Sequence, residues 1–375
     1  MRKFLFIAAN EAVKWAGSEP LWGSAAERLA RRGDEVRVSA KDWGERVPQI
    51  ERLRLAGCKI FGRRPPTLRA RIAKRIFSLP EFPLRHLRAA AEGIDLVVIS
   101  QGLNTEGLLW MEAAHTTGHN YAIIAQGAAE QWWPYDEFGE RLGNCYESAR
   151  AAYFVSQANV ELCRRQFGSP LGNAKVVRNP FNVRYDAQPA WPSDFSDGLS
   201  LACVARLDVS QKGQDLLLEV LGLPKWRQRK VRVSLVGKGI HERSLRRIVE
   251  QRELTNVEFA GFSNNIEEVW SKHHALVLAS RYEGMPLALV EAMLCGRACI
   301  VTDVAGHKEL VRDGVNGFLA KAPTVEHLDE AMNRAWENRN RLEEMGRTAG
   351  EDVRVWVSAD PVEDFVRELE ALVER

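Results

Sequence analysis

The stretch from Ser280 to Glu309, S-R-Y-E-G-M-P-L-A-L-V-E-A-M-L-C-G-R-A-C-I-V-T-D-V-A-G-H-K-E, decides how this chain is expected to fold. It follows an apolar run at 275–279 that predicts a short buried strand. An apolar helical segment at 287–295 begins after Pro286 and ends before Gly296. A second apolar run at 298–302 predicts another buried strand. Strand, loop, helix and strand in this order indicate a parallel α/β sheet.

The same alternation extends outward over the whole chain. Apolar runs predict strands at 4–8, 36–38, 59–61, 96–99, 122–125 and 152–155, with helical patterns at 23–31 and 142–150. A second series predicts strands at 199–205, 231–236, 257–260, 275–279, 298–302 and 317–320. Residues 168–192, rich in Pro, Gly and Asn, predict an interdomain linker between the two series.

This organisation predicts two Rossmann-like α/β domains whose parallel sheets face each other across a cleft. The first domain is expected at 1–183 and the second at 184–356. An amphipathic helix at 362–372, within a terminal segment at 357–375, is expected to cross back onto the first domain.

Length and composition indicate a soluble protein without a nucleic-acid partner. The 375 residues are 45% hydrophobic and 27% charged, with a net charge of +2. No apolar run reaches the roughly 18 residues of a membrane-spanning helix, and the N-terminal run is short for a signal peptide. The six cysteines form no metal-binding pattern, which favours reduced thiols and a cytoplasmic location.

Two carboxylates, Glu283 and Glu291, bracket the loop and the start of the helix. The backbone N–H groups between them are free to bind an anion, as at other helix N-termini. A ligand with hydroxyls at both ends and phosphate in the middle, such as a nucleotide sugar, fits this layout. The candidate donor-binding residues between the carboxylates are Met285, Pro286, Leu287 and Ala288.

The pair Glu283 and Glu291 in E-G-M-P-L-A-L-V-E resembles the E-x7-E signature of retaining GT-B glycosyltransferases of the group 1 type, family 4. The segments that continue to Glu309 and the later D-G-V-N-G-F-L are similar to the same family. The resemblance is close over the C-terminal half and loose over the N-terminal half. It implies that Glu283 faces the donor sugar and that Glu291 holds the ribose hydroxyls.

Arg206 and Lys212 are the candidate cations of this site. Arg206 ends the first strand of the second domain, and Lys212 precedes a helix. The segment resembles the family's G-R-L-x-x-x-K-G, although Ala205 replaces the glycine and the spacing is one residue longer. The resemblance implies that both clamp the donor diphosphate. Fixed cations stabilise the charge that develops on a leaving phosphate, which makes both residues catalytic candidates.

Other turns resemble the family less closely. Gly237 in a second glycine turn and Phe262 are implied to shape the nucleotide pocket. Gly17 lies in a loop similar to the family's Gly-Gly-x-Glu, with Ala16 in place of the first glycine. Gln126 stands where the family has His, and an amide can hydrogen-bond a sugar hydroxyl without carrying charge.

Asn179 precedes Pro180, so this pair should fix a turn in the segment that leads out of the first domain. The surrounding residues are similar to the family's segment before the linker. Asn179 is therefore a further candidate donor contact, although we favour a structural turn as its role.

A basic stretch at 63–88 has three interpretations: a helix on a membrane surface, an ordinary solvated helix, or a patch for an anionic acceptor. Its apolar residues Leu68, Ile72 and Ile76 share one helical face. A nucleic-acid role is disfavoured because no binding motif accompanies the charges. Its cations include Arg63, Arg64, Arg69, Arg71, Lys74, Arg75 and Arg85.

The predicted function is transfer of a sugar from a nucleotide sugar, with UDP the expected nucleotide, to an acceptor hydroxyl in glycan, glycolipid or glycoside synthesis. No Asp-x-Asp occurs, and we expect no cofactor and no metal. Two alternatives stay open: a catalytically silent nucleotide-sugar-binding protein, and a GT-B epimerase or phosphorylase. Trp132 and Trp133 could stack on a sugar ring, but we expect buried core aromatics there.

Overall fold

The computed structural model describes residues 1–11, 14–15, 17–64, 82–192 and 195–374. The chain divides into two compact units. The first unit contains Met1–Pro180 and Asp360–Arg375, and the second contains Phe181–Ala359. The expected helix face around residues 68–76 and the loop residue Ala16 lie outside the described residues.

The first unit is built on a seven-stranded parallel sheet in the order β3-β2-β1-β4-β5-β6-β7. Its central strands β4, β5 and β6 are buried along their whole length, which explains why they are apolar without alternation. The strands are β1 Lys3–Ala8, β2 Glu35–Lys41, β3 Lys59–Arg63, β4 Leu96–Gln101, β5 Tyr121–Ala125, β6 Ala151–Phe154 and β7 Ala174–Val176.

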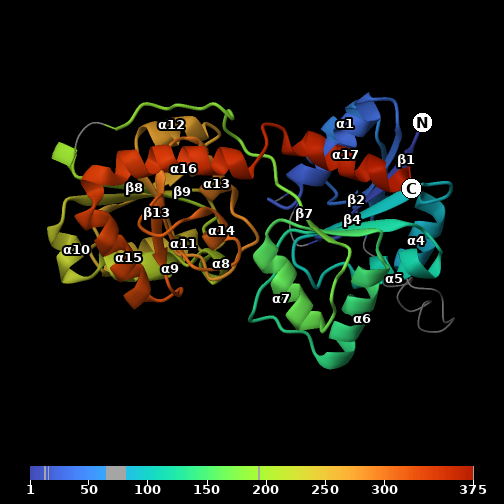
Figure 1. The fold of residues 1–375 in the computed structure, drawn as a ribbon, viewed down its shortest axis with the longest axis horizontal. Helices are drawn as coiled ribbons and strands as arrows, with labels where there is room; N and C mark the ends of the chain where they lie inside the picture. The colour runs from blue at the N-terminus through green and yellow to red at the C-terminus, as the bar shows by residue number, and fades with distance from the viewer. Residues whose placement is uncertain (12–13, 16, 65–81, 193–194, 375) are drawn as a thin grey trace. The chain divides into compact units, whose positions relative to one another are not determined.

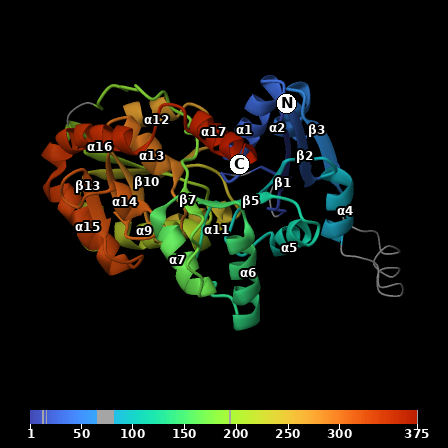
Figure 2. The same ribbon diagram turned by 45° about the vertical axis from the view of Figure 1, so that its right-hand side comes forward.

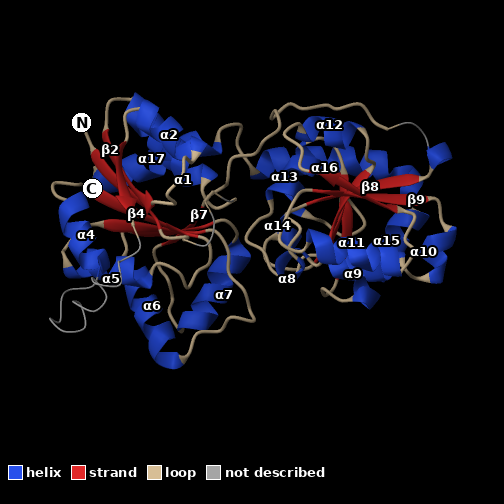
Figure 3. Ribbon diagram, turned by 180° about the vertical axis from the view of Figure 1, so that it is seen from behind, coloured by secondary structure: helices blue, strands red, loops and turns tan. Residues whose placement is uncertain are grey.

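Helices cover both faces of this sheet (Figure 3). One core cluster joins the sheet to α1, α2 and α17, and the other joins it to α4, α5, α6 and α7. The helices are α1 Pro20–Arg31, α2 Pro48–Leu55, α4 Phe82–Ala90, α5 Leu108–Thr116, α6 Asp136–Ser148, α7 Gln157–Phe167 and α17 Pro361–Val373.

The second unit repeats this plan with six parallel strands in the order β10-β9-β8-β11-β12-β13. The strands are β8 Leu199–Val204, β9 Val231–Val236, β10 Val257–Gly261, β11 Ala275–Leu278, β12 Ala298–Thr302 and β13 Gly317–Ala320. The helices are α8 Val209–Lys212, α9 Gln214–Leu221, α10 Pro224–Gln228, α11 Glu242–Gln251, α12 Ile266–Ser271, α13 Leu287–Leu294, α14 His307–Leu310, α15 Val325–Glu337 and α16 Leu342–Trp356.

The prediction of two parallel α/β domains is confirmed, because both sheets contain only parallel pairs among the described residues. In each sheet the strand order reverses between the first and fourth strands of the unit, and ligands of such sheets bind at the carboxyl edge beside that point. The linker prediction for 168–192 is wrong in part. The segment 168–192 contains β7, which pairs with β6, for example Tyr153 with Lys175, and completes the first sheet.

The C-terminal helix α17 packs beside α1 of the same unit, and both ribbons stay adjacent when the view is turned (Figures 1 and 2). Asp360 caps the helix by accepting the N–H of Glu363, and Pro361 occupies its first turn. Phe365, Val366 and other apolar residues of α17 are buried in the same core cluster as α1. The last residues therefore complete the core of the first unit.

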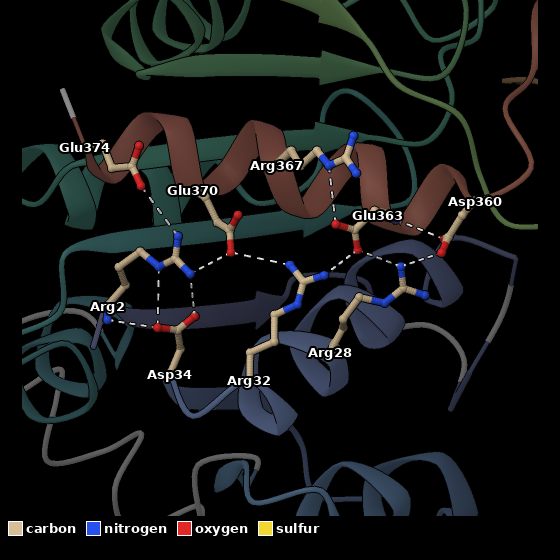
Figure 4. A network of polar contacts seen from close by, with 9 residues as sticks. All are labelled: Arg2, Arg28, Arg32, Asp34, Asp360, Glu363, Arg367, Glu370 and Glu374. Carbon is tan, nitrogen blue, oxygen red and sulfur yellow. Dashed lines mark hydrogen bonds and ion pairs between the residues drawn. The ribbon is translucent and has the colours of Figure 1, made fainter.

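A continuous chain of ion pairs fastens α17 to β1 and α1 (Figure 4). The guanidinium of Arg2 lies between Asp34 at 3.1 Å and Glu370 at 2.6 Å. Arg32 reaches Glu363 at 2.6 Å, and Arg28 pairs with both Glu363 and the capping carboxylate. Arg2, Arg28 and Arg32 each pair with at least two carboxylates, which holds the chain more firmly than an isolated surface pair.

Replacing Glu363 with glutamine should lower the free energy of unfolding by about 1 kcal/mol at pH 7, since solvent screens part of the attraction. The Arg32 guanidinium, followed by that of Arg28, lowers the Glu363 pKa to about 2. The unfolded-state value is about 4.3, so this stabilisation is present above pH 4.3 and is lost as pH falls towards 2. Urea unfolding between pH 7 and pH 3 measures it.

The matched control is Glu374→Gln, at the exposed end of the same network. It should change the free energy of unfolding much less than Glu363→Gln. A destabilisation by Glu363→Gln that stays constant from pH 7 to pH 3 would contradict the assignment.

The basic stretch differs from the expectation at its first residue. Arg63 ends β3 and is buried, donating to the carbonyl oxygens of Ala8 and Ser39. It belongs to the fold rather than to an exposed patch, whereas Arg64 and Arg85 are exposed. Among the described residues, no helix has the length and hydropathy needed to cross a membrane.

Candidate functional site

The charged candidates of the second unit meet at the carboxyl edge of its sheet. Lys212 ends α8, which follows β8, and Glu283 lies in the loop after β11. Because β8 and β11 are parallel neighbours at the point where the strand order reverses, the segments that follow them emerge at the same edge. The structure therefore brings together two residues that are separated by 71 positions.

Glu283 is buried at this edge, with only 3% of its surface exposed. Its Oε1 accepts hydrogen bonds from Lys212 Nζ at 2.5 Å and from Ser280 Oγ at 2.8 Å. The ammonium balances the buried carboxylate, and the hydroxyl helps to fix its rotamer. Lys212 and Glu283 therefore form a buried ion pair with set geometry.

Gly213 makes this pair possible. It follows α8 with a φ of +61°, and a Cβ added there would lie 2.0 Å from the carbonyl oxygen of Ala279. Only glycine lets the chain after Lys212 approach the end of β11 this closely in a left-handed conformation.

Replacing Gly213 with alanine should lower the free energy of unfolding by about 2 kcal/mol or more, because the clash is with backbone and the φ is unfavourable. Denaturant unfolding measures the loss. Gly168→Ala is the matched control, since that φ is +59° with no neighbour within 4 Å. Equal losses for both variants would contradict the close approach.

Arg206 lies beside the ion pair and is linked to it through a residue that the sequence did not single out. Its guanidinium, 46% exposed, contacts Gln211 Oε1 at 2.9 Å and Asp208 at 3.2 Å. Gln211 Nε2 in turn donates to Glu283 at 3.5 Å. All three predicted catalytic residues thus lie in one contiguous polar cluster, with Gln211 as the bridge.

The N-terminus of α13 adds a source of positive potential. Pro286 is its N-cap residue, and no side chain caps the helix or places an acid in its first turn. The N–H groups at Leu287 and Ala288 therefore have no carbonyl partner within the helix. Met285 is buried just before this turn. Such a helix start favours an anionic ligand.

Glu291 lies one turn into α13 and is also buried. Its Oε1 accepts hydrogen bonds from the backbone N–H of Asn182 at 2.9 Å and from Asn182 Nδ2 at 2.8 Å. Burial raises the pKa of this carboxyl, and the two hydrogen bonds oppose the rise. Asn182 was not among the predicted site residues, although it lies only three positions after Asn179.

His307 is a second residue that sequence reasoning missed. It is fully buried at the start of α14, and its Nδ1 lies 2.6 Å from the carbonyl oxygen of Thr302, which requires the proton on Nδ1. Burial lowers its pKa, and the nearby carboxylate of Glu283 opposes that effect. A neutral imidazole therefore lies near the Lys212–Glu283 ion pair. His307 lies inside the quoted stretch 280–309, but nothing in the sequence showed that its ring is buried near Glu283.

The predicted nucleotide-side residues lie along the neighbouring strands. Gly237 follows β9 with a φ of +150°, where a Cβ would meet the carbonyl oxygen of Ala205 at 2.0 Å. Phe262 follows β10 and is exposed. A surface hollow of about 470 Å³ lies after the Gly237 turn, lined by Gly239, Ile240, Glu242, Arg243 and Arg246.

In the first unit, the structure brings together two of the three predicted residues. Asn179 Nδ2 donates to Gln126 Oε1 at 2.7 Å, which joins the segment after β7 to the end of β5. The other amide atoms, Gln126 Nε2 and Asn179 Oδ1, are buried without a hydrogen-bond partner among the described residues. Gly17 is exposed in the loop between β1 and α1, where a Cβ would meet nothing within 4 Å.

The expectation that Trp132 and Trp133 are core aromatics is wrong. Their side chains are 47% and 58% exposed in the segment between β5 and α6. The apolar core of this unit is filled by strand and helix residues instead. The two tryptophans lie outside any helix or strand, so no helical or strand periodicity indicates whether they are buried.

Comparison with known proteins identifies the second unit. Residues 193–352 match the family model "Glycosyl transferases group 1". The chain is 32% identical over 126 residues to the putative glycosyltransferase EpsD of Bacillus subtilis, covering 33% of each chain. It is 24% identical over 164 residues to the poly(ribitol-phosphate) alpha-N-acetylglucosaminyltransferase of Staphylococcus aureus, covering 43% of this chain and 33% of that protein. The aligned stretch thus spans about a third of each relative's length.

Solved structures share the fold over the whole chain. HepE from Anabaena, crystallised in complex with UDP, has a TM-score of 0.77 at 19% identity, covering 98% of this chain and 99% of that one. TarM from S. aureus has a TM-score of 0.72 at 13% identity, with complete coverage of both chains, in a complex that contains UDP. These likenesses establish the GT-B glycosyltransferase fold that the sequence resemblance implied. Within the second unit, residues 193–352 thus form a domain that matches the group 1 glycosyltransferases.

Proposed function

We propose that this protein is a retaining glycosyltransferase that moves a sugar from a nucleoside diphosphate sugar, UDP-sugar in the first place, to an acceptor hydroxyl. The observation that carries the proposal is the buried Lys212–Glu283 pair with Arg206 beside it, at the carboxyl edge of a group 1 domain. The UDP bound to HepE and TarM supports the choice of nucleotide.

Each charged group has a role that its surroundings support. Arg206 and Lys212 would neutralise the donor diphosphate, together with the N–H groups at the start of α13. Glu283, oriented by Ser280, would accept hydrogen bonds from the sugar hydroxyls. Glu291, fixed by Asn182, would accept them from the ribose.

The chemical step is proposed as a displacement on one face of the sugar. The bond from the anomeric carbon to the phosphate oxygen breaks, and a bond to the acceptor oxygen forms on the same face. The acceptor proton passes to an oxygen of the leaving diphosphate. Arg206 and Lys212 hold the negative charge that develops there, so we propose that the reaction needs no metal ion.

The first unit is proposed as the acceptor domain and the second as the donor domain. Gly17, Gln126 and Asn179 stay proposed donor contacts on the sequence resemblance. The buried Nε2 of Gln126 and Oδ1 of Asn179 support this, because unpaired buried amide atoms are costly unless a ligand satisfies them. Peripheral membrane contact through residues 63–88 in a cytoplasmic protein stays a prediction.

The test is an assay of the purified protein with UDP-glucose, UDP-galactose and UDP-N-acetylglucosamine, following release of UDP with EDTA and with magnesium. Slow hydrolysis of at least one donor is expected, and EDTA should leave its rate unchanged. NMR of the released sugar reports whether the anomeric configuration is retained. UDP binding without cleavage of any donor would favour the catalytically silent alternative.

A further inference from the structure

Three large aromatic side chains are exposed within four residues of the segment between β5 and α6. Trp132, Trp133 and Tyr135 are 47%, 58% and 67% exposed, whereas Pro134 between them is buried. The other large exposed hydrophobic residues that the structure describes are not adjacent to one another in sequence. Scattered exposed apolar residues are normal, but a contiguous aromatic group of this kind marks a binding surface.

The segment that carries these aromatics is fixed by the interior of the first unit. The backbone N–H of Asn104 donates to the carbonyl oxygen of Gly127 at 2.9 Å, and Gln166 Nε2 donates to that of Ala129, also at 2.9 Å. Asn104 Nδ2 also donates to Gln166 Oε1 at 2.7 Å, and both side chains are buried. The exposed rings therefore stand on a supported segment, which reduces the entropy lost when they bind a partner.

The ring of Tyr135 is held in place as well. It stacks on Phe138 of α6, with the ring centroids 5.5 Å apart and an interplanar angle of 27°. This contact leaves most of the ring exposed to solvent. Tyr and Trp combine a large apolar face with a polar group, so such side chains bind partners that are apolar on one side and hydrated on the other.

The charged residues near the three aromatic side chains disfavour an anionic partner. Residues 128–140 contain the four acids Glu130, Asp136, Glu137 and Glu140 and no lysine or arginine. Arg165 of α7 is near, but it pairs with Glu130 at 3.5 Å. Acidic side chains repel the anionic surface of a membrane or a nucleic acid. They can still accept hydrogen bonds from hydroxyl groups.

We propose that Trp132, Trp133 and Tyr135 form a stacking platform for the acceptor, and that the acceptor there is a neutral saccharide chain. Pyranose rings offer an apolar C–H face to an aromatic ring and hydroxyls to the surrounding carboxylates. The platform lies six residues along the chain from Gln126, the proposed donor contact. The proposal rests on the proposed function and specifies the acceptor of the same reaction.

The test compares Trp132→Ala/Trp133→Ala with Trp132→Phe/Trp133→Phe and with Leu109→Ala. Leu109 is 47% exposed on α5 of the same unit and serves as the matched control. The probes are the neutral hexasaccharides of maltose, cellulose and chitin, titrated by saturation-transfer NMR and calorimetry. Circular dichroism and thermal unfolding check that each variant is folded.

We expect at least one hexasaccharide to bind the wild-type protein, and the double alanine variant to lose about tenfold or more in affinity, since both stacking contacts are gone. The phenylalanine and Leu109 variants should stay within about twofold of wild type. The proposal is overturned by affinity that survives in the double alanine variant. It is also overturned by failure of all three probes, or by aromatic-dependent binding to phosphatidylglycerol vesicles instead.

Stabilisation by UDP, measured on the same samples, separates this proposal from the proposed function. UDP should raise the unfolding temperature of every variant equally, because none of the substitutions touches the second unit. If UDP stabilises the wild type while saccharide binding does not depend on the tryptophans, only the platform is wrong. If UDP, GDP, ADP and TDP all fail to stabilise the wild type, the proposed function itself is wrong.

Discussion

Replacing Lys212 with alanine is expected to lower kcat by about 10²- to 10³-fold, the cost typical of removing one group that stabilises transition-state charge. The Nζ of Lys212 lies 2.5 Å from Glu283 and is only partly exposed, so its charge is little screened by water. The charge on the leaving diphosphate grows as the anomeric bond breaks, which makes the loss larger in kcat than in donor affinity. Steady-state kinetics with a UDP-sugar that the wild-type protein cleaves measures both.

Two further variants separate catalysis from folding. Lys212→Ala leaves Glu283 buried without its cation, so the unfolding temperature is measured alongside the rate. Lys212→Arg keeps the charge and should recover part of kcat. Lys272→Ala removes an exposed lysine that pairs with Glu268 on α12, and should leave kcat unchanged. If Lys212→Ala keeps the wild-type kcat, Lys212 does not stabilise the transition state and its proposed role is wrong.

Replacing Glu283 with glutamine is expected to reduce transfer by about 10²-fold or more, while UDP still binds. The amide has nearly the shape of the carboxylate, and Ser280 Oγ can still donate to its oxygen. The charge is lost, however, and one of the two acceptor atoms becomes a donor, so the sugar hydroxyls are no longer held. The ratio of kcat to UDP affinity, measured in both proteins, isolates this effect.

Glu268→Gln serves as the control because Glu268 is an exposed glutamate of the same unit that pairs with Lys272. It should match the wild type in kcat and in UDP affinity. If Glu283→Gln retains full transfer, Glu283 has only the structural role of balancing Lys212. In that case the assignment of the sugar-binding carboxylate fails, although the match of residues 193–352 to the family model stands.

The sequence predicted the site best where charged residues directly follow a predicted strand. Buried strands followed by glycine-containing turns predicted the carboxyl edge of the sheet, and the family resemblance implied that Arg206, Lys212 and Glu283 bind one ligand there. The direct contact between Lys212 and Glu283 could not be predicted, because it depends on how the segments after β8 and β11 approach each other. Gly213 permits that approach, and its need for a left-handed conformation is visible only in the backbone.

Residues that are placed by tertiary contacts could not be singled out from the sequence. His307, Gln211 and Asn182 owe their places to contacts with Thr302, Glu283 and Glu291. The errors have the same origin. β7 is only three residues long and pairs along one edge, so its Gly- and Pro-rich surroundings predicted a linker. Trp132 and Trp133 are apolar by type, and only the structure places them at the surface.

The central claim is that the cluster of Arg206, Lys212 and Glu283 binds a nucleoside diphosphate, and thermal unfolding against UDP, GDP, ADP and TDP tests it most directly. At about 100 times its dissociation constant, a ligand adds about 2.7 kcal/mol to the free energy of unfolding. We expect UDP to stabilise the wild-type protein equally with EDTA and with magnesium, and Arg206→Ala to remove most of that shift. If none of the four nucleotides stabilises the protein, or if Arg206→Ala keeps the full shift, the cluster is not the donor site.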